Sequence, residues 1–263
     1  MRPFASLILA IALVGVGCGG ASDRVVVAAG TTVVDSGFMQ AVIDEFVESG
    51  GAGEFSLVGV ASAEALALLD GGAAQLIVTH APQLEDAHLA EHPGTEAVGV
   101  FVSRFLIVGP QGQTVVPSLS DAADAFTAIA AAEATFVSRG DGSGTHGREI
   151  ELWSLAGRQP FGAVWYVETG QGMGFTLQVA DQRDGFTLTE HGAFLAASER
   201  LTITPVLLSD QDGLDNPYRV LIDSASPDEA RRFADWLTSP AGSAAVLRVN
   251  ERLFGSVVYQ PSS

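Results

Sequence analysis

Short apolar runs alternate with segments of helical periodicity from Arg24 onward. The runs are rich in β-branched residues and have the length of buried strands. We expect strands at residues 25–29, 55–60, 76–78, 98–108, 135–137, 164–167, 186–188, 203–208 and 219–222. Strands that alternate with helices favour an α/β fold in which each sheet is mostly parallel and flanked by helices.

The segments between these runs place their apolar residues on one face. In the segment 35–48, Phe38, Val42 and Phe46 recur at every fourth position, which is typical of an amphipathic helix. Several segments begin with Ser, whose hydroxyl caps the free N–H groups of a first helical turn. We expect helices at residues 35–48, 62–69, 120–132, 143–156, 172–182 and 226–238.

Two breaks divide the chain after Arg24. Gly109-Pro110-Gln111-Gly112 follows a strand, and residues 210–217 form an acidic stretch that contains Gly and Pro. These breaks predict one lobe made of residues 24–108 and 210–263, with a second lobe, residues 109–209, inserted into it. Small ligands commonly bind in the cleft between two such lobes.

The N-terminus has the pattern of an export signal. Arg2 precedes an apolar run at residues 4–16, which is shorter than the roughly 20 residues that span a bilayer. We therefore expect a signal peptide at residues 1–18. Cys18 lies where a bacterial lipoprotein carries its lipid, although Gly15 stands where Leu is usual. We expect an exported protein anchored to the cell envelope through Cys18, with an ordinary cleaved signal as the alternative.

Composition excludes several classes of protein. The chain has 13 basic and 31 acidic side chains, a formal net charge of −18, so it lacks the basic face that nucleic acids require. Every basic residue is Arg, which excludes a phosphate-loop lysine and a Schiff-base lysine. A single Cys excludes disulfide frameworks and cysteine-rich zinc sites.

One glycine-rich turn carries the clearest motif. A strand ends at Ser138, Arg139 follows, and Ser143, Gly144 and Thr145 then open a helix. The first turn of a helix offers free N–H groups and a positive dipole end to an anion. The hydroxyls add further donors, and arginine presents a planar fork suited to oxyanions. This turn therefore predicts a binding site for a small oxyanion.

Three further turns between a strand and a helix carry similar donors. Thr31 and Thr32 follow the first strand, Ser62 opens a second helix, and Gly172 and Met173 open a third. In open α/β sheets, ligands bind outside the carboxyl ends of the strands. Because these turns come from both predicted lobes, we expect them to face one cleft.

Other chemistry is conceivable around the same turns. Residues 142–147 fit the dinucleotide fingerprint, but that motif normally opens the first βα unit of a cofactor domain. An envelope enzyme would use His80, Asp141, His146 or Glu168 as acid–base groups or metal ligands, yet no nucleophile with a supporting base is recognisable. We expect no catalytic residue, no cofactor and no bound metal.

Several segments together resemble the tungstate-binding proteins of bacterial ABC transporters: residues 135–146 with Trp153, and residues 165–173, 186–189, 216–218 and 233–240. That family belongs to the periplasmic-binding-protein superfamily, which also contains molybdate and phosphate receptors. The resemblance implies a two-lobed, type II-like fold that closes around a tetrahedral dianion. It also implies a monomer that delivers the anion to the permease subunits of an importer.

The second-lobe motif of that family matches closely. Ser138 and Arg139 match its Ser-Arg pair, and Gly172 and Met173 match without change. Arg139 with the tripeptide at residues 143–145 also resembles an element of phosphate receptors.

The first-lobe motif departs from the family. Its Thr-Thr-Thr-Ser run aligns with residues 29–32, where Ala29 and Gly30 lack hydroxyls. Ser62 falls where the family has a small hydroxyl residue or a Gly-rich turn, whereas Ala81 stands where the family usually has Asp after His80. These departures leave molybdate, phosphate or another anion open as an alternative to tungstate.

Overall fold

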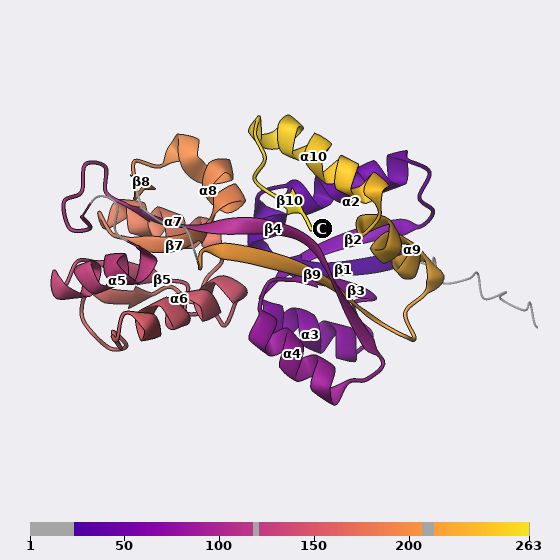
Figure 1. The fold of residues 1–263 in the computed structure, drawn as a ribbon, viewed down its shortest axis with the longest axis horizontal. Coiled ribbons are helices and arrows are strands. Elements are labelled where there is room, and N and C mark those ends of the chain that lie inside the picture. Colours follow the sequence, from indigo (N-terminus) through magenta and orange to yellow (C-terminus); the bar gives the residue numbers. More distant parts are fainter. Residues whose placement is uncertain (1–23, 118–120, 207–212, 263) are drawn as a thin grey trace, which may run out of the picture.

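The computed structural model describes residues 24–117, 121–206 and 213–262 (Figure 1). The predicted signal peptide and Cys18 lie outside these ranges. So do the predicted lobe boundary at 209–210 and the end of the predicted strand 203–208. No helix in the described ranges is long and apolar enough to cross a membrane.

The first lobe is built around a mixed sheet in the strand order β10-β4-β9-β3-β1-β2. Strand β1 pairs in parallel with β2 and β3, whereas β9 is antiparallel to both β3 and β4. The sheet is therefore mixed, not mostly parallel as expected, and its parallel part is the β2-β1-β3 group. Its elements are β1 (Arg24–Gly30), α1 (Thr31–Asp35), α2 (Phe38–Glu48), β2 (Glu54–Val60), α3 (Ser62–Asp70), β3 (Leu76–Thr79), α4 (Pro82–Glu91), β4 (Thr95–Gly109), β9 (Asp215–Asp223), α9 (Asp228–Leu237), α10 (Pro240–Phe254) and β10 (Gln260–Pro261).

Alternation along β1 explains why helices cover both faces of this sheet. Val25, Val27 and Ala29 are buried against α2, α9 and α10 in one core. Ala28 belongs to a second core on the opposite face, with residues of α3. Successive side chains of a strand point to opposite faces, so one strand supplies both cores.

The second lobe has a small parallel pair, β5 and β6, and a bridge from Phe136 to Phe186 extends it. Its core is strongly aromatic: the rings of Phe126 and Trp153 have their centroids 4.4 Å apart, and those of Phe136 and Trp153 5.0 Å. Its elements are α5 (Ala122–Ala131), β5 (Phe136–Ser138), α6 (Gly144–Leu155), β6 (Tyr166–Glu168), α7 (Met173–Gln182), β7 (Thr187–Glu190), α8 (His191–Ala197), a 3-10 turn (Ser198–Arg200) and β8 (Thr204–Pro205).

Strand β4 belongs to both lobes. Over residues 95–104 it pairs with β9 in the first lobe, and over residues 105–109 it pairs with β7 and β8 in the second. In Figure 1, β4 and β9 run side by side through the middle of the molecule. A continuous strand therefore connects the two cores, and the predicted lobe boundary at 108–109 stays a prediction.

The structure corrects one of the predicted helices and adds others. The helix predicted at 35–48 is confirmed only from Phe38 onward, because Gly37 adopts a φ of 75° and separates α1 from α2. Helices α1, α4, α8 and α10 were not predicted. Helix α4 buries the polar residues Glu85 and His88, so a search for apolar periodicity cannot find it.

Candidate functional site

The carboxyl ends of three parallel strands lie at one edge of the first-lobe sheet. Gly30 is in register with Val60, and Ala29 with Val78. The residues that follow these strands therefore emerge at that same edge. They are Thr31 after β1, Ser62 after β2 and His80 after β3.

Two turns of the second lobe are joined in the same way. Ser138 is in register with Glu168. The backbone N–H of Thr169 donates to the Ser138 carbonyl at 3.0 Å, and that of Gly170 donates to the Arg139 carbonyl at 2.8 Å. These bonds bring the turn before α6 against the turn before α7.

The two edges meet across the boundary between the lobes. Arg139 Nη2 donates to Thr31 Oγ1 at 2.8 Å. A Cβ at Gly144 would lie only 2.4 Å from the His80 carbonyl oxygen, so only glycine allows this approach. A Cβ at Gly172 would lie 3.9 Å from a carboxylate oxygen of Asp35. The predicted turns before α1, α6 and α7 therefore do converge.

Arg139 is a buried cation with one nitrogen left over. Its side chain is 1% exposed, and its Nε and Nη2 donate to Asp141 Oδ2 at 3.1 and 2.5 Å. Its Nη1 is buried and has no hydrogen-bond partner among the residues that the structure describes. Burial alone would raise the pKa of Asp141, but the charge of Arg139 and hydrogen bonds from Ser143 outweigh it and lower that pKa.

Three more buried donors lack a hydrogen-bond partner in the described part of the chain: Ser62 Oγ at the carboxyl edge of the first-lobe sheet, and Thr145 Oγ1 and Asn216 Nδ2 beside the boundary. Ser62 begins α3, Thr145 lies in the first turn of α6, and the Oδ1 of Asn216 lies 2.8 Å from His80 Nδ1. Buried polar groups are almost always hydrogen-bonded in folded proteins. Together with Arg139 Nη1 the three make four buried donors without a partner in the described ranges. Such a set is expected at a binding site for a ligand rich in hydrogen-bond acceptors.

The other predicted site residues already have partners or serve through their backbone. Thr32 Oγ1 bonds to the Tyr218 hydroxyl at 3.0 Å, and Ser138 Oγ accepts from the Gly140 N–H at 3.1 Å. Ser143 caps α6 by accepting from the His146 N–H at 3.3 Å. The Met173 side chain is buried in the second-lobe core, so only its backbone lies at the start of α7.

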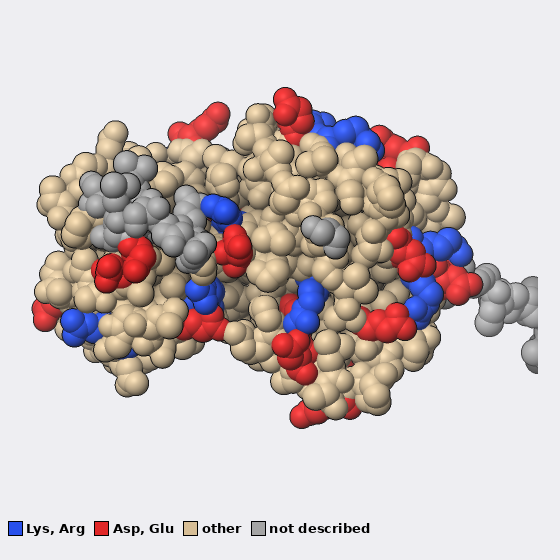
Figure 2. Space-filling model, viewed as in Figure 1, with Lys and Arg blue, Asp and Glu red and all other residues tan. Residues whose placement is uncertain are grey.

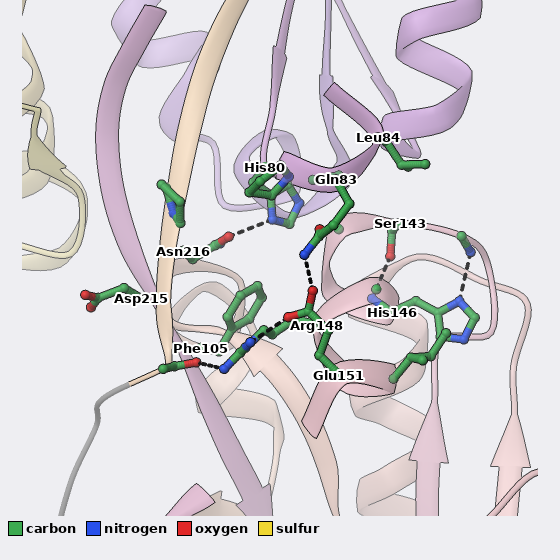
Figure 3. Close-up of a pocket in the computed structure, with 18 residues that line it drawn as sticks. His80, Gln83, Leu84, Phe105, Ser143, His146, Arg148, Glu151, Asp215 and Asn216 are labelled. Atoms are coloured by element: carbon green, nitrogen blue, oxygen red, sulfur yellow. Dashed lines mark hydrogen bonds and ion pairs between the residues drawn. The ribbon is translucent and has the colours of Figure 1, made fainter. Parts of the chain in front are cut away.

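A cavity of about 580 Å³ opens beside these turns (Figure 3). Both lobes line it, with His80, Gln83 and Asn216 on one side and Ser143 and Gly144 on the other. At its rim the Gln83 amide donates to the Glu151 carboxylate across the lobes. The cavity is therefore a cleft between the lobes.

The two histidines of this cleft, His80 and His146, have local hydrogen-bonding roles. Burial, reinforced by the charge of Arg139, lowers the pKa of His80 to about 4, so this ring is neutral at pH 7. His146 Nδ1 accepts from the Gly142 N–H at 3.0 Å, as a local hydrogen-bonding residue does. Burial raises the pKa of Glu149 to about 7, and its carboxyl accepts from Tyr166 and Trp153 in the core.

Sequence reasoning missed two contributors to the site. In the sequence Asn216 appears only within a motif, although its amide supplies one of the free donors. Asp141 is expected only as an acid–base group or metal ligand of an enzyme, although it holds Arg139 in place. The position of Asn216 at the start of a strand, beside the end of β3, was the available signal.

A two-lobed α/β architecture with a cleft between the lobes is typical of periplasmic solute-binding proteins. Residues 19–241 match the family model described as the PBP superfamily domain. The chain therefore belongs to the periplasmic-binding-protein superfamily, as the motifs implied.

Three comparisons give this assignment more detail. A Haloferax volcanii protein named as an ABC transporter anion-binding protein is 34% identical over 255 residues, which cover 93% of this chain and 73% of that protein. The tungstate-binding protein TupA of Peptoclostridium acidaminophilum is 28% identical over 256 residues, covering 92% of this chain and 87% of that protein. The crystal structure of the tungstate ABC transporter from Geobacter sulfurreducens is 31% identical, with a TM-score of 0.76, covering 86% of this chain and 98% of that one. The predicted fold class and family resemblance are confirmed.

Proposed function

We propose that this protein captures tungstate in the cleft between its lobes and delivers it to the permease of an ABC importer. The observation that carries the proposal is the buried guanidinium of Arg139, which spans the lobes and keeps Nη1 free. The relatives named for tungstate or anion binding support the choice of ligand. In this proposal the protein is a binding protein and not an enzyme.

The proposed ligand contacts combine one charge with several neutral donors. Arg139 Nη1, Ser62 Oγ, Thr145 Oγ1 and Asn216 Nδ2 supply hydrogen bonds. The first turns of α3, α6 and α7 add N–H groups and positive dipole ends. Each hydrogen bond to a charged group contributes about 1.5–3 kcal/mol, so four to six of them hold a dianion without a second buried cation.

Residues 24–108 and 210–263 form one closing body in this proposal, and residues 109–209 form the other. Strand β4 links them, and the contact of Arg139 with Thr31 belongs to the closed form. The protein works as a monomer, since both halves of the site come from one chain.

The acidic surface does not oppose capture of an anion. Figure 2 shows arginines interspersed among acidic side chains and broad uncharged areas on one face of the molecule. Charges more than about 8–10 Å from a site are largely screened at physiological ionic strength. The net charge of −18 therefore has little effect on a ligand held beside a buried arginine.

The first prediction concerns Arg139. Replacing it in Arg139→Ala removes the only charge donated to the ligand and leaves Asp141 unpaired, so tungstate affinity falls at least 100-fold. Isothermal titration with tungstate measures this, with molybdate, phosphate and sulfate titrated in parallel. Arg183→Ala, an exposed arginine of the same lobe, is the matched control. Unchanged tungstate affinity in a folded Arg139→Ala protein would contradict the proposed function. A preference of the unmodified protein for another anion would make that anion the ligand in place of tungstate.

The second prediction separates binding from stability. In Ser62→Ala and Thr145→Val, tungstate affinity falls about tenfold or more, because each change removes a donor to the anion. The free energy of unfolding without ligand stays equal or rises by about 1 kcal/mol, because a buried unpaired hydroxyl is removed. Urea unfolding and titration measure the two effects. Ser154→Ala, exposed on α6, should change neither quantity. Loss of stability with unchanged affinity would assign these hydroxyls a structural role instead.

The third prediction tests the contact between the lobes. Gly144→Ala puts a methyl group against the His80 carbonyl, so the lobes cannot close fully and tungstate binds at least tenfold more weakly. Gly147→Ala on the same helix meets no atom within 4 Å and should bind as the unmodified protein does. The radius of gyration at saturating tungstate, from small-angle scattering, should be larger for Gly144→Ala alone. Equal affinity in the two variants would mean that this contact is absent from the bound form.

The fourth prediction concerns the envelope anchor. We propose that residues 1–18 direct export and that Cys18 carries a lipid, because the lone cysteine directly follows a short apolar run. Mass spectrometry of protein extracted from membranes should find diacylglycerol on Cys18. Cys18→Ser should release the protein into the soluble envelope fraction. An unmodified Cys18 in mature protein would favour an ordinary cleaved signal.

A further inference from the structure

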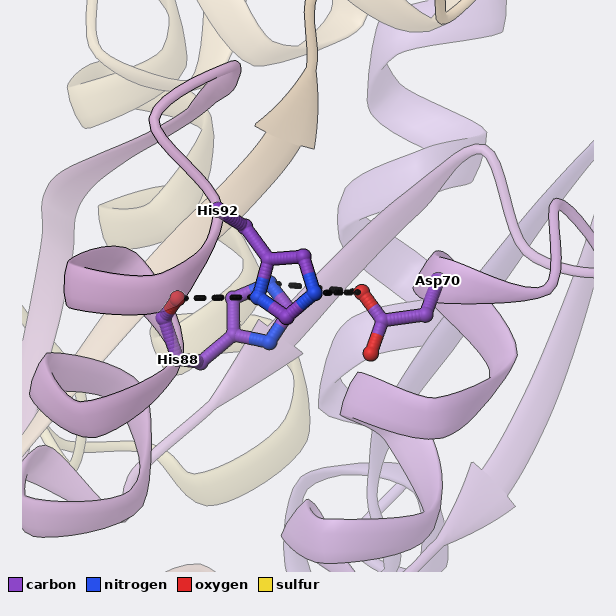
Figure 4. Close-up of side chains that lie close together, drawn as sticks. All are labelled: Asp70, His88 and His92. Atoms are coloured by element: carbon purple, nitrogen blue, oxygen red, sulfur yellow. Dashed lines mark hydrogen bonds and ion pairs between the residues drawn. The ribbon is translucent and has the colours of Figure 1, made fainter.

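Three potential metal ligands lie together away from the cleft (Figure 4). Asp70 is the last residue of α3, His88 lies in the last turn of α4, and His92 directly follows α4. The spacing of four residues places the two histidines on one side of the helix end. Sequence reasoning expected no metal and did not single out these residues.

The distances among their ligand atoms fit one small cation. His88 Nε2 lies 3.6 Å and His92 Nε2 3.5 Å from Asp70 Oδ1, and the three atoms all lie within 4.8 Å of one another. Zinc binds imidazole nitrogen and carboxylate oxygen at about 2.0–2.1 Å, so neighbouring ligands of a tetrahedral site are about 3.4 Å apart. The observed separations are thus close to those of a formed site.

The imidazoles are also oriented for a metal. His92 Nδ1 lies 3.0 Å from the His88 carbonyl oxygen, so it donates its proton there and leaves the Nε2 lone pair facing Asp70. The His88 side chain is 5% exposed, and its Nε2 has no hydrogen-bond partner among the described residues. The two rings stack with centroids 4.1 Å apart and an interplanar angle of 16°. A buried nitrogen that makes no hydrogen bond and lies 3.6 Å from a carboxylate oxygen is the second observation that points to a ligand.

We propose that Asp70, His88 and His92 bind one divalent transition-metal ion with the coordination preference of zinc. Two imidazoles and one carboxylate suit zinc, nickel or copper, whereas calcium and magnesium prefer oxygen ligands alone. The side chains of Asp70 and His92 are each 41% exposed, so solvent reaches the fourth position. A groove of about 430 Å³ beside the site contains Asp223, a further negative charge that favours a cation.

The site lies at the opposite end of two helices from the oxyanion cleft. Helices α3 and α4 begin at Ser62 and Pro82, at the carboxyl ends of β2 and β3, and end at Asp70 and Glu91, beside the histidines. Ten helical residues span about 15 Å, so the metal does not touch the anion. Its role is to tie the two helix ends together, where the negative ends of their dipoles also favour a cation.

Titration of the purified, untagged protein with ZnCl₂ in a buffer without chelators tests this site. The expected result is saturable binding of one Zn²⁺ per chain and a higher melting temperature with Zn²⁺ present. Co²⁺ as a spectroscopic probe should give the visible absorption bands of a tetrahedral ion. His92→Ala and Asp70→Asn should each weaken Zn²⁺ binding at least tenfold. At the buried position the variant is His88→Gln, because glutamine fills more of the space left by the imidazole than alanine does.

The controls separate this proposal from the proposed function. His191→Ala removes a partly buried histidine of the second lobe and should leave Zn²⁺ binding unchanged. Tungstate affinity should be the same in His92→Ala as in the unmodified protein. No saturable Zn²⁺ binding, or equal binding in the Asp70→Asn/His92→Ala double variant, would overturn the metal site and leave the oxyanion site untouched.

Discussion

The arrangement of the two lobes depends on the interactions of the buried Arg139 guanidinium. Removing a cation from water is costly unless hydrogen bonds and an opposite charge compensate. Asp141 in the same turn supplies the charge, and Thr31 in the other lobe supplies an acceptor. Neither satisfies Nη1, so in the proposed function an anion between the lobes would complete the compensation and draw the lobes together.

The path of the chain makes that contact reproducible. Because β4 pairs with β9 in one lobe and with β7 in the other, the two lobes share one strand. In the proposed closing motion, the close approach of Gly144 to His80 limits how far the lobes close. A site assembled in this way is tight only when both halves are present, which suits a protein that must release its ligand to a partner.

Sequence patterns identified the segments that form the site better than the contacts between their residues. The strand-to-helix turns at Thr31, Arg139 and Gly172 follow from apolar runs and glycine-rich signals, which are local. The role of Asn216 depends on its contact with His80 in a distant segment, which no local pattern encodes. Asp141 lies only two residues after Arg139, but the burial of Arg139 that gives Asp141 its role depends on the tertiary fold. Helix α4 was missed because its buried residues Glu85 and His88 are polar, so its buried face carries no apolar pattern.

Buried polar groups lie at both ends of the pair of helices α3 and α4, and they indicate a ligand at each end. A helix concentrates unsatisfied N–H groups at its start and unsatisfied carbonyls at its end, so one element favours an anion and a cation at opposite termini. Here Ser62 and its unpaired hydroxyl lie at the start of α3, while Asp70 and the unpaired His88 nitrogen lie at the other end of the pair. Each unpaired group costs stability in the protein alone, and a ligand of the appropriate charge recovers it. Two ligands of opposite charge would therefore stabilise the first lobe independently, one through the cleft and one through the helix ends.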